Sequence, residues 1–189
     1  MTRLFLIRHG EAAAAWGGDD HDPGLSELGR SQAEAAARVL AGLGSLRVLC
    51  SPMQRCRETS APYLAKASAE ALIEPRVSEV PTPADIADRR LWLQQNFPWR
   101  GGAVRSWREI DARLSPWRQA LIECVSSVRE DTAVFSHFIA INVVCGAALG
   151  RDETIVCKPD YASITELEVS GGRLRLVRHG AEMQAGEVR

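Results

Sequence analysis

Two histidines and two arginines stand at or shortly after the ends of apolar runs in the sequence. They are Arg8, His9, Arg55 and His137. Neither histidine has an acidic residue at the spacing of metal ligands, so the group favours a metal-free anion site. A phosphoryl group fits such a site, because neutral imidazole can attack phosphorus while arginine and a protonated histidine neutralise the phosphoryl oxygens.

The apolar runs have the length and content of buried β-strands. They cover residues 3–7, 46–50 and 132–135. A helical pattern follows each run, and this alternation predicts an α/β fold: a three-layer α/β/α sandwich with a mostly parallel central sheet. Sites in such sheets form just beyond the carboxyl ends of strands, so the polar residues after the three runs are expected to share one pocket.

Local signals predict where two of the helices begin. Ser26 can cap a helix that follows a loop rich in Gly, Asp and Pro, with Gly29 as the third helical residue. Ser51 and Pro52 supply an N-cap and a first helical residue, which predicts a helix from about Pro52 to Lys66.

The rest of the chain contains an irregular excursion and three regular parts. Several prolines and a glycine pair between residues 74 and 102 indicate a long irregular segment with one helix over about 85–96. An excursion of this length usually covers a site. The regular parts are a helix over 106–128 with a core-facing stripe, an apolar helix over 139–149, and a hairpin with strands 162–169 and 173–178.

The composition is that of an ordinary globular protein. The 189 residues carry a net charge of −1, with 46% hydrophobic and 25% charged residues. A chain this long removes roughly 70% of its unfolded surface from water and needs no disulfide or structural metal. No apolar run approaches the ~20 residues of a membrane span and no secretory signal is recognisable, so a cytoplasmic location is expected. We expect one domain over 1–189, with a lid-like excursion at about 74–105.

Cysteine and charge usage exclude several classes of function. The five cysteines include no Cys-x-x-Cys pair, so we interpret them as reduced core residues. The 23 basic residues, all arginine except Lys66 and Lys158, nearly balance 24 acidic ones, which gives no overall attraction to nucleic acid or membrane. The arginines and tryptophans between residues 99 and 118 fit a buried tryptophan stripe and a solvated arginine face better than a nucleic-acid site.

Four segments resemble, in order, the motifs of the histidine phosphatase superfamily, also called the phosphoglycerate mutase-like fold. Leu6-Ile7-Arg8-His9-Gly10-Glu11 resembles its signature, and residues 22–33 resemble its leucine, glycine and glutamine-alanine helix start. Residues 51–59 resemble its second arginine motif, and Ser136-His137 matches its second histidine. A lone Arg-His-Gly is a weak signal, whereas four ordered motifs are a specific one.

The resemblance implies a metal-independent phosphatase, of the short bacterial type, that needs no cofactor. His9 becomes transiently phosphorylated, and water then attacks the phosphohistidine. Arg8, Arg55 and His137 bind the phosphoryl oxygens. The residues expected to contact the substrate are Gly10, Glu11, Ser51 and Phe138.

A carboxylate must protonate the leaving group, and its identity is open. Glu79 lies where the family places this acid, within the excursion expected to cover the pocket. Burial or anionic neighbours must raise the pKa of Glu79 for it to act as an acid near neutrality. Asp85 is the alternative, and a third interpretation of Glu79 is an exposed loop carboxylate without a role.

Phe138 departs from the family pattern, because many members have Gly after the second histidine. A side chain there forbids the most open backbone geometry. We hypothesise that Phe138 walls the pocket and favours an apolar or aromatic part of the substrate. Arg57, His21 and the second Arg-His-Gly, at 178–180, are interpreted as lying outside the site.

Hydrolysis is favoured over two alternatives. A phosphoglycerate mutase-type phosphotransferase uses the same pocket but returns the phosphoryl group to a different oxygen, and this chain lacks the additional segments of the larger mutases. A catalytically weak phosphate-binding module is disfavoured because the arginines and histidines are intact. The expected partner is a small phosphorylated substrate or a phosphoprotein, not nucleic acid or membrane, and the sequence predicts no oligomeric state.

Overall fold

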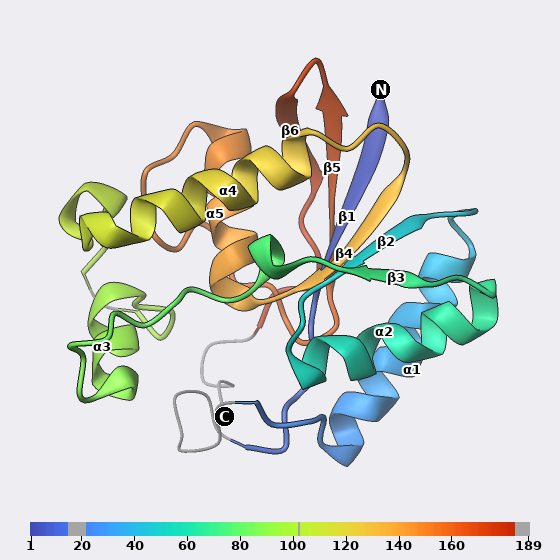
Figure 1. Cartoon of the computed structure of the whole chain (residues 1–189), viewed down its shortest axis with the longest axis horizontal. Coiled ribbons are helices and arrows are strands. Elements are labelled where there is room, and N and C mark those ends of the chain that lie inside the picture. Colours follow the sequence, from blue (N-terminus) through green and yellow to red (C-terminus); the bar gives the residue numbers. More distant parts are fainter. Residues whose placement is uncertain (15–21, 102, 184–189) are drawn as a thin grey trace.

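The computed structural model describes residues 1–14, 22–101 and 103–183, and a six-stranded sheet runs through them in the order β3-β2-β4-β1-β5-β6 (Figure 1). The strands are β1 (Thr2–Arg8), β2 (Arg47–Cys50), β3 (Ala71–Ile73), β4 (Thr132–Ser136), β5 (Ile164–Ser170) and β6 (Arg173–Arg178). The first four of these in sheet order pair in parallel, and the hairpin of β5 and β6 adds two antiparallel strands beside β1. The predicted mostly parallel sheet is confirmed.

Helices cover both faces of the sheet (Figure 1). They are α1 (Glu27–Ala41), α2 (Gln54–Ala67), α3 (Arg89–Asn96), α4 (Ser115–Ser126) and α5 (Phe138–Leu149). Side chains of a strand alternate between faces, so β1 sends Phe5 and Ile7 into the core under α1 and α2. Leu4 and Leu6 enter the larger core on the other face, which α3, α4 and α5 share.

The pairing register brings the ends of three strands together. Arg8 at the end of β1 pairs with Ser136 at the end of β4, and Cys50 at the end of β2 pairs with Phe135. The residues that follow these strands therefore emerge side by side at one edge of the sheet, as expected from the sequence.

Helix α1 begins as predicted, and helix α2 does not. The Ser26 hydroxyl accepts a hydrogen bond from the Gly29 N–H at 3.0 Å. Helix α2 begins at Gln54 and not at Pro52, because the Ser51 hydroxyl lies 2.8 Å from the His137 ring instead of capping the helix. The carboxylate of Asp22 accepts from the Gln54 N–H at 2.7 Å and satisfies that helix end.

The predicted helix over 106–128 is wrong in its first half. Two short 3₁₀ turns, η2 (Trp107–Glu109) and η3 (Ala112–Leu114), precede α4 because the side chains of Ser106 and Asp111 cap each turn separately. Its apolar stripe nevertheless lies in the core, as predicted. The helix expected over 85–96 starts only at Arg89, where the Asp88 carboxylate accepts from the Leu91 N–H at 2.9 Å.

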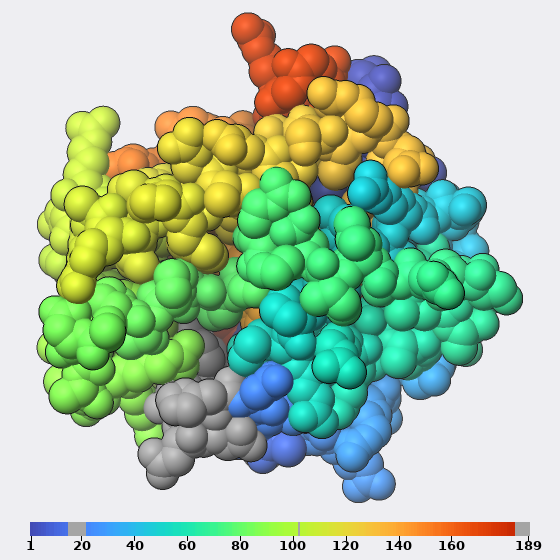
Figure 2. All heavy atoms as spheres, viewed as in Figure 1, coloured from blue at the N-terminus to red at the C-terminus, as the bar shows by residue number. Residues whose placement is uncertain are grey.

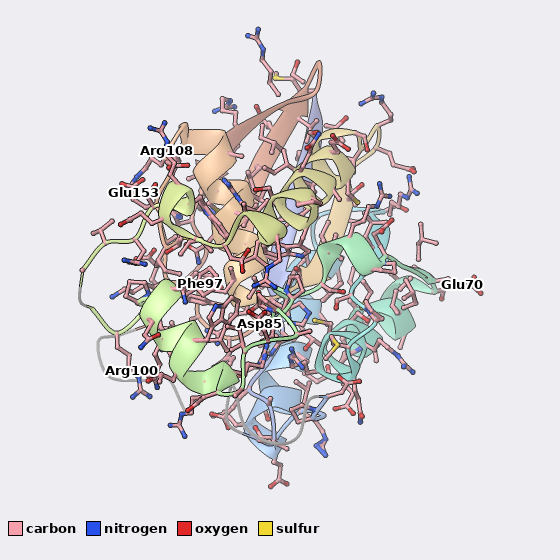
Figure 3. The ribbon with its side chains drawn as sticks, turned by 60° about the vertical axis from the view of Figure 1, so that its left-hand side comes forward. Glu70, Asp85, Phe97, Arg100, Arg108 and Glu153 are labelled. Carbon is pink, nitrogen blue, oxygen red and sulfur yellow. The ribbon has the colours of Figure 1, made fainter. Side chains whose placement is uncertain are left out.

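The segment 74–105 crosses the carboxyl edge of the sheet as η1 (Pro75–Val77), an irregular stretch and α3. Its green atoms lie between those of α2 and α4 in Figure 2. The Ser136 hydroxyl donates to the Val77 carbonyl at 2.6 Å, which fixes one end to β4. Beyond its other end a bridge joins Ser106 to Glu153, near the labelled Arg108 and Glu153 in Figure 3.

Two further sequence interpretations bear on the class of protein. All five cysteines are buried free thiols, in line with a role in the core. Among the described residues, no helix combines the length and apolar content needed to cross a bilayer.

Candidate active site

His9 directly follows β1 at the carboxyl edge of the sheet. Its Nδ1 lies 2.7 Å from the Gly10 carbonyl oxygen, and because a carbonyl only accepts, Nδ1 carries the proton and Nε2 keeps its lone pair. Burial, and after it the charges of Arg55 and Arg8, holds the pKa of His9 well below its usual range. His9 is therefore a neutral imidazole whose Nε2 is available for attack.

The loop after His9 is tied to helices α1 and α2. The Gly10 N–H donates to the Thr59 hydroxyl at 2.9 Å, and the Glu11 N–H donates to the Gln32 side-chain oxygen at 2.8 Å. The carboxylate of Glu11 accepts from the Ser26 hydroxyl at 2.8 Å. The Glu11 side chain thus helps to fix the start of α1, in a position predicted for substrate contact.

Two glycines allow this loop to approach α1. A Cβ atom on Gly29 would lie 2.1 Å from the Glu11 carbonyl oxygen, and one on Gly10 would lie 2.6 Å from the Gly29 carbonyl oxygen. Both contacts involve backbone atoms, so neither position accepts a side chain without movement. The glycines at the signature and at the helix start therefore have one shared packing role.

Arg8 is a buried cation, 5% exposed, and takes part in no ion pair within the described parts of the chain. Its NH1 donates to the Pro159 carbonyl at 2.9 Å and lies 3.1 Å from the Met183 sulfur. Its Nε is buried, and no residue in the described ranges accepts a hydrogen bond from it. Desolvation lowers the pKa of Arg8, although a guanidinium stays protonated in proteins. An anion can satisfy this donor and this charge.

His137 joins Arg55 to Ser51. Its Nδ1 lies 3.2 Å from NH2 of Arg55, which can only donate, so the ring proton lies on Nε2 and is donated to the Ser51 hydroxyl at 2.8 Å. Burial, followed by the charge of Arg55, holds the pKa of His137 well below its usual range. The rings of His9 and His137 have centroids 5.3 Å apart. His137 is neutral here, and a second proton on Nδ1 requires an anion to offset the nearby cations.

Glu79 lies at the N-terminus of α5, on the segment 74–105. Its carboxyl oxygens accept from the backbone N–H groups of Val80 at 3.0 Å, Ile139 at 3.2 Å and Ala140 at 3.3 Å. Burial raises the pKa of Glu79 and outweighs these hydrogen bonds and the charges of Arg55 and Arg89. The raised pKa is the property that the sequence required of an acid near neutrality.

Asp85, the alternative acid, does not join this cluster. Its carboxylate lies on the connection before α3 (Figure 3) and accepts from Arg113 at 2.8 Å. The hydrogen bond from Arg113 lowers the pKa of the exposed Asp85, so this group is a weaker proton donor than Glu79.

Phe138 does not form the exposed pocket wall that we hypothesised. Only 5% of its surface is exposed, because its ring packs in the larger hydrophobic core. The ring lies 5.1 Å from the guanidinium carbon of Arg8. Its contact is therefore with a phosphate-binding candidate, and little of the ring remains to face a substrate.

The residues interpreted as bystanders lie outside the cluster where the structure describes them. Arg57 is exposed, and so are Arg178 and His179 of the second Arg-His-Gly. Arg178 pairs with Glu166 of the neighbouring strand at 3.3 Å. His21 lies outside the described residues.

Three residues near the cluster were missed from the sequence. Thr59 lies one helical turn after Arg55, within the quoted motif, so helical spacing could have found it. Tyr161 stands in the loop before β5, with its ring centroid 6.1 Å from that of His9, and no sequence signal marks it. Arg89 is half-buried, donates to the Thr82 hydroxyl at 2.8 Å and opposes the rise in the pKa of Glu79.

The chemistry of the cluster is that of an anion site. In the described part of the chain, no three His, Cys, Asp or Glu side chains gather as a metal site would need. Positive charge comes instead from arginines beside two neutral imidazoles. Fixed guanidinium donors and a nucleophilic nitrogen together suit the transfer of a phosphoryl group.

The sequence matches the family model of the histidine phosphatase superfamily (branch 1) over residues 4–182. The chain belongs to the histidine phosphatase superfamily. This confirms the resemblance found in its four motifs.

Curated relatives within the superfamily carry both phosphatase and mutase names. A probable phosphatase of Schizosaccharomyces pombe is 45% identical over 65 residues, 33% of this chain and 31% of that protein. Glucosyl-3-phosphoglycerate phosphatase of Mycolicibacterium vanbaalenii is 32% identical over 61% of this chain and 51% of its own. A probable phosphoglycerate mutase of Photorhabdus laumondii is 26% identical over 79% of this chain and 76% of its own. The match thus spans about a third of the length of the yeast relative.

Solved structures share the whole fold at low sequence identity. The mycobacterial glucosyl-3-phosphoglycerate phosphatase has a TM-score of 0.71 at 22% identity, covering 97% of this chain and 100% of its own. The YhfR protein of Bacillus stearothermophilus has a TM-score of 0.73 at 19% identity, covering 99% and 100%. The phosphoglycerate mutase-like fold is confirmed.

Proposed function

We propose that this chain is a metal-independent phosphatase that hydrolyses a phosphomonoester through a covalent phosphohistidine at His9. The observation that carries the proposal is the fixed tautomer of His9: Nδ1 donates to the Gly10 carbonyl and leaves a neutral Nε2 among buried cations. Arg8 and Arg55 supply the positive charge that stabilises the transferring phosphoryl group.

The reaction has two steps that share one pocket. In the first, Nε2 of His9 forms a bond to phosphorus, the P–O ester bond breaks, and the leaving oxygen takes a proton from the Glu79 carboxyl group. In the second, Glu79 as a carboxylate takes a proton from water, the water oxygen bonds to phosphorus, and the N–P bond breaks. Inorganic phosphate leaves, and both His9 and Glu79 return to their starting states.

Glu79 is the proposed acid because burial favours its protonated form. It lies on the segment 74–105, which we propose acts as a lid-like part of one catalytic domain over 1–189. The position of Glu79 then depends on the packing of that segment against β4 and α5, through Val77 and the α5 N-terminus.

The substrate class rests on charge and on relatives. The buried arginines favour a phosphate monoester dianion. Relatives named for glucosyl-3-phosphoglycerate and α-ribazole-5′-P support a phosphate ester of a small sugar-like alcohol as the first class to screen. A phosphohistidine on a protein is the second class, because the same nucleophile accepts a phosphoryl group from nitrogen.

The decisive experiment compares phosphate release from an aryl phosphate, with a chelator present, by the native protein, His9→Ala and His179→Ala. His179 is exposed, so its replacement is a matched control. We expect activity in the native protein and the control only. Native protein and control should also form a phosphoenzyme that is labile to acid and stable to base. Equal activity in His9→Ala would remove the nucleophile and the proposal with it.

Replacing the acid tests the second part of the mechanism. Glu79→Gln keeps the size of the side chain and removes its proton transfer, so kcat should fall by roughly 100- to 10,000-fold with alkyl phosphates. An aryl phosphate has a better leaving group and should lose less. The same loss for both substrate types would argue that Glu79 does not protonate the leaving oxygen.

A mutase is the second candidate, because probable phosphoglycerate mutases match three quarters of their length to this chain. Product analysis with phosphoglycerate separates the two. Free phosphate as the main product supports the phosphatase, whereas an isomeric phosphoglycerate supports the mutase.

A further inference from the structure

Arg8 is held in an unusual way for a buried cation. A guanidinium in a protein interior commonly pairs with a carboxylate, which fixes its plane and cancels its charge. Within the described residues Arg8 has no such pair. Two aromatic side chains contact it instead: the ring of Tyr161 lies 3.9 Å from its guanidinium carbon and the Tyr161 side chain also hydrogen-bonds to it, and the ring of Phe138 lies 5.1 Å away.

Aromatic contacts have a consequence that a carboxylate would not have. A ring face attracts the cation without accepting the guanidinium N–H groups along their own directions. The Pro159 carbonyl accepts a hydrogen bond from NH1, the Met183 sulfur lies close to the same nitrogen, and none of the described residues accepts from the buried Nε. Arg8 therefore keeps its full charge for an incoming phosphoryl group.

The two rings come from well-anchored parts of the fold. Phe138 is the first residue of α5, is 5% exposed and packs in the core. The loop that carries Tyr161 is pinned to α5 by Asn142, whose side-chain oxygen accepts from the N–H groups of Val156 at 2.7 Å and Cys157 at 2.9 Å. The same loop meets the site again where the Ala162 N–H donates to the His9 carbonyl at 3.3 Å.

We propose that Phe138 and Tyr161 are positioning residues that hold the Arg8 guanidinium by cation–π contact, so that it binds the phosphoryl group with its charge unpaired. This arrangement gives a structural use to Phe138, which stands where many superfamily members have glycine. The inference rests on the proposed function for its catalytic meaning, and its structural part can be tested by phosphate binding alone.

The test compares Tyr161→Leu with Tyr161→Phe. Phenylalanine keeps the ring, whereas leucine keeps apolar bulk without a π face. We expect Tyr161→Leu to weaken binding of inorganic phosphate, measured by calorimetry, by about tenfold. Tyr161→Phe should stay within about twofold of the native protein. The phosphatase KM should rise with the phosphate Kd in Tyr161→Leu and be restored in Tyr161→Phe.

A spectroscopic measurement separates positioning from mere stability. Rings close to Arg8 shift the NMR signal of its Nε–H, and this signal is assigned by its absence in Arg8→Lys. The shifted signal should persist in Tyr161→Phe, move toward ordinary arginine positions in Tyr161→Leu, and respond to added phosphate. Phe138→Leu provides a second variant with the same expected direction.

The outcomes distinguish this inference from the proposed function. If His9→Ala retains activity but Tyr161→Leu weakens phosphate binding as expected, the phosphohistidine mechanism fails and the positioning role stands. If the native protein binds and hydrolyses phosphate esters but Tyr161→Leu and Tyr161→Phe behave alike in phosphate affinity and in the Arg8 signal, the positioning role is overturned.

Discussion

Replacing Gly29 with alanine tests whether helix α1 fixes the position of His9. The new Cβ atom would lie 2.1 Å from the Glu11 carbonyl oxygen, which must retreat by about 0.9 Å (3.0 − 2.1) to reach even the 3.0 Å that real Cβ contacts rarely cross. The contact is with backbone, so rotation of a side chain cannot relieve it. Because interiors are close-packed, the displacement passes to the loop that carries His9.

Two free energies oppose each other in Gly29→Ala. Alanine is favoured over glycine inside a helix by about 1 kcal/mol, whereas overpacking costs about 1–3 kcal/mol. A backbone contact this short should cost an amount near the upper end of the overpacking range. We therefore expect the free energy of unfolding to fall by about 2 kcal/mol net and the melting temperature by roughly 4–8 °C. A shift of His9 approaching 1 Å should lower kcat by roughly 100-fold.

Gly42→Ala, at the other end of the same helix, is the matched control. A Cβ there would lie 3.4 Å from the Val39 carbonyl oxygen, and the φ of −78° suits alanine. It should keep kcat and change stability by less than about 1 kcal/mol. Thermal unfolding and phosphate release are measured on both variants. A Gly29→Ala protein as stable and active as Gly42→Ala would refute the reasoning that this packing positions His9.

Three further predictions concern the charges around His9. The folded state holds the pKa values of His9 and His137 well below about 6.5, so the unfolded chain takes up protons first and stability falls as the pH drops below 6.5. The free energy of unfolding should change by up to about 1.4 kcal/mol per pH unit for each histidine. Denaturant titrations at pH 7.5 and 5.5 measure this change, which should be smaller in His137→Asn. Arg55→Ala should weaken phosphate binding by at least about tenfold, whereas replacement of the exposed Arg57 by alanine should leave it within twofold; equal losses in a calorimetric titration would contradict the placement of Arg55. At a pH above the second ionisation of inorganic phosphate, its binding should take up protons, because an anion favours the protonated forms of His137 and Glu79. Calorimetry in buffers of different ionisation enthalpy measures this uptake, and its absence would contradict the prediction.

The parts of the site that the sequence predicted are those that local pattern and sheet topology determine together. Apolar runs indicated β1, β2 and β4, and parallel strands end at one edge of a sheet, so His9, Ser51 and His137 had to meet there. The start of α1 at Ser26 was also local, because an N-cap hydroxyl and its helix are neighbours in sequence.

The sequence predictions were wrong where a residue distant in the sequence takes the hydrogen bond that a local pattern indicated. The sequence predicted that Ser51 caps α2, but the Ser51 hydroxyl hydrogen-bonds to His137, 86 residues away. The Asp22 carboxylate instead accepts from the N–H of Gln54, the first residue of α2. The apolar stripe predicted one continuous helix, but the side chains of Ser106 and Asp111 each cap a short 3₁₀ turn before α4. Tyr161 reaches Arg8 only through the folded path of the loop after α5, which no spacing in the sequence encodes.

Burial and the charges of the site explain why its two histidines are neutral. Burial raises the free energy of a charged imidazole, and the charges of Arg55 and Arg8 add to that cost, so both imidazoles give up their second proton. Neutrality makes His9 a nucleophile. Among the carboxyl groups near these cations, Asp22 lies 3.9 Å from Arg55, and Glu79 is the one whose own burial favours protonation. A phosphoryl dianion is the group that balances this cluster, because it offsets the arginines, allows His137 to take a second proton on Nδ1 and leaves the Glu79 proton for the departing oxygen.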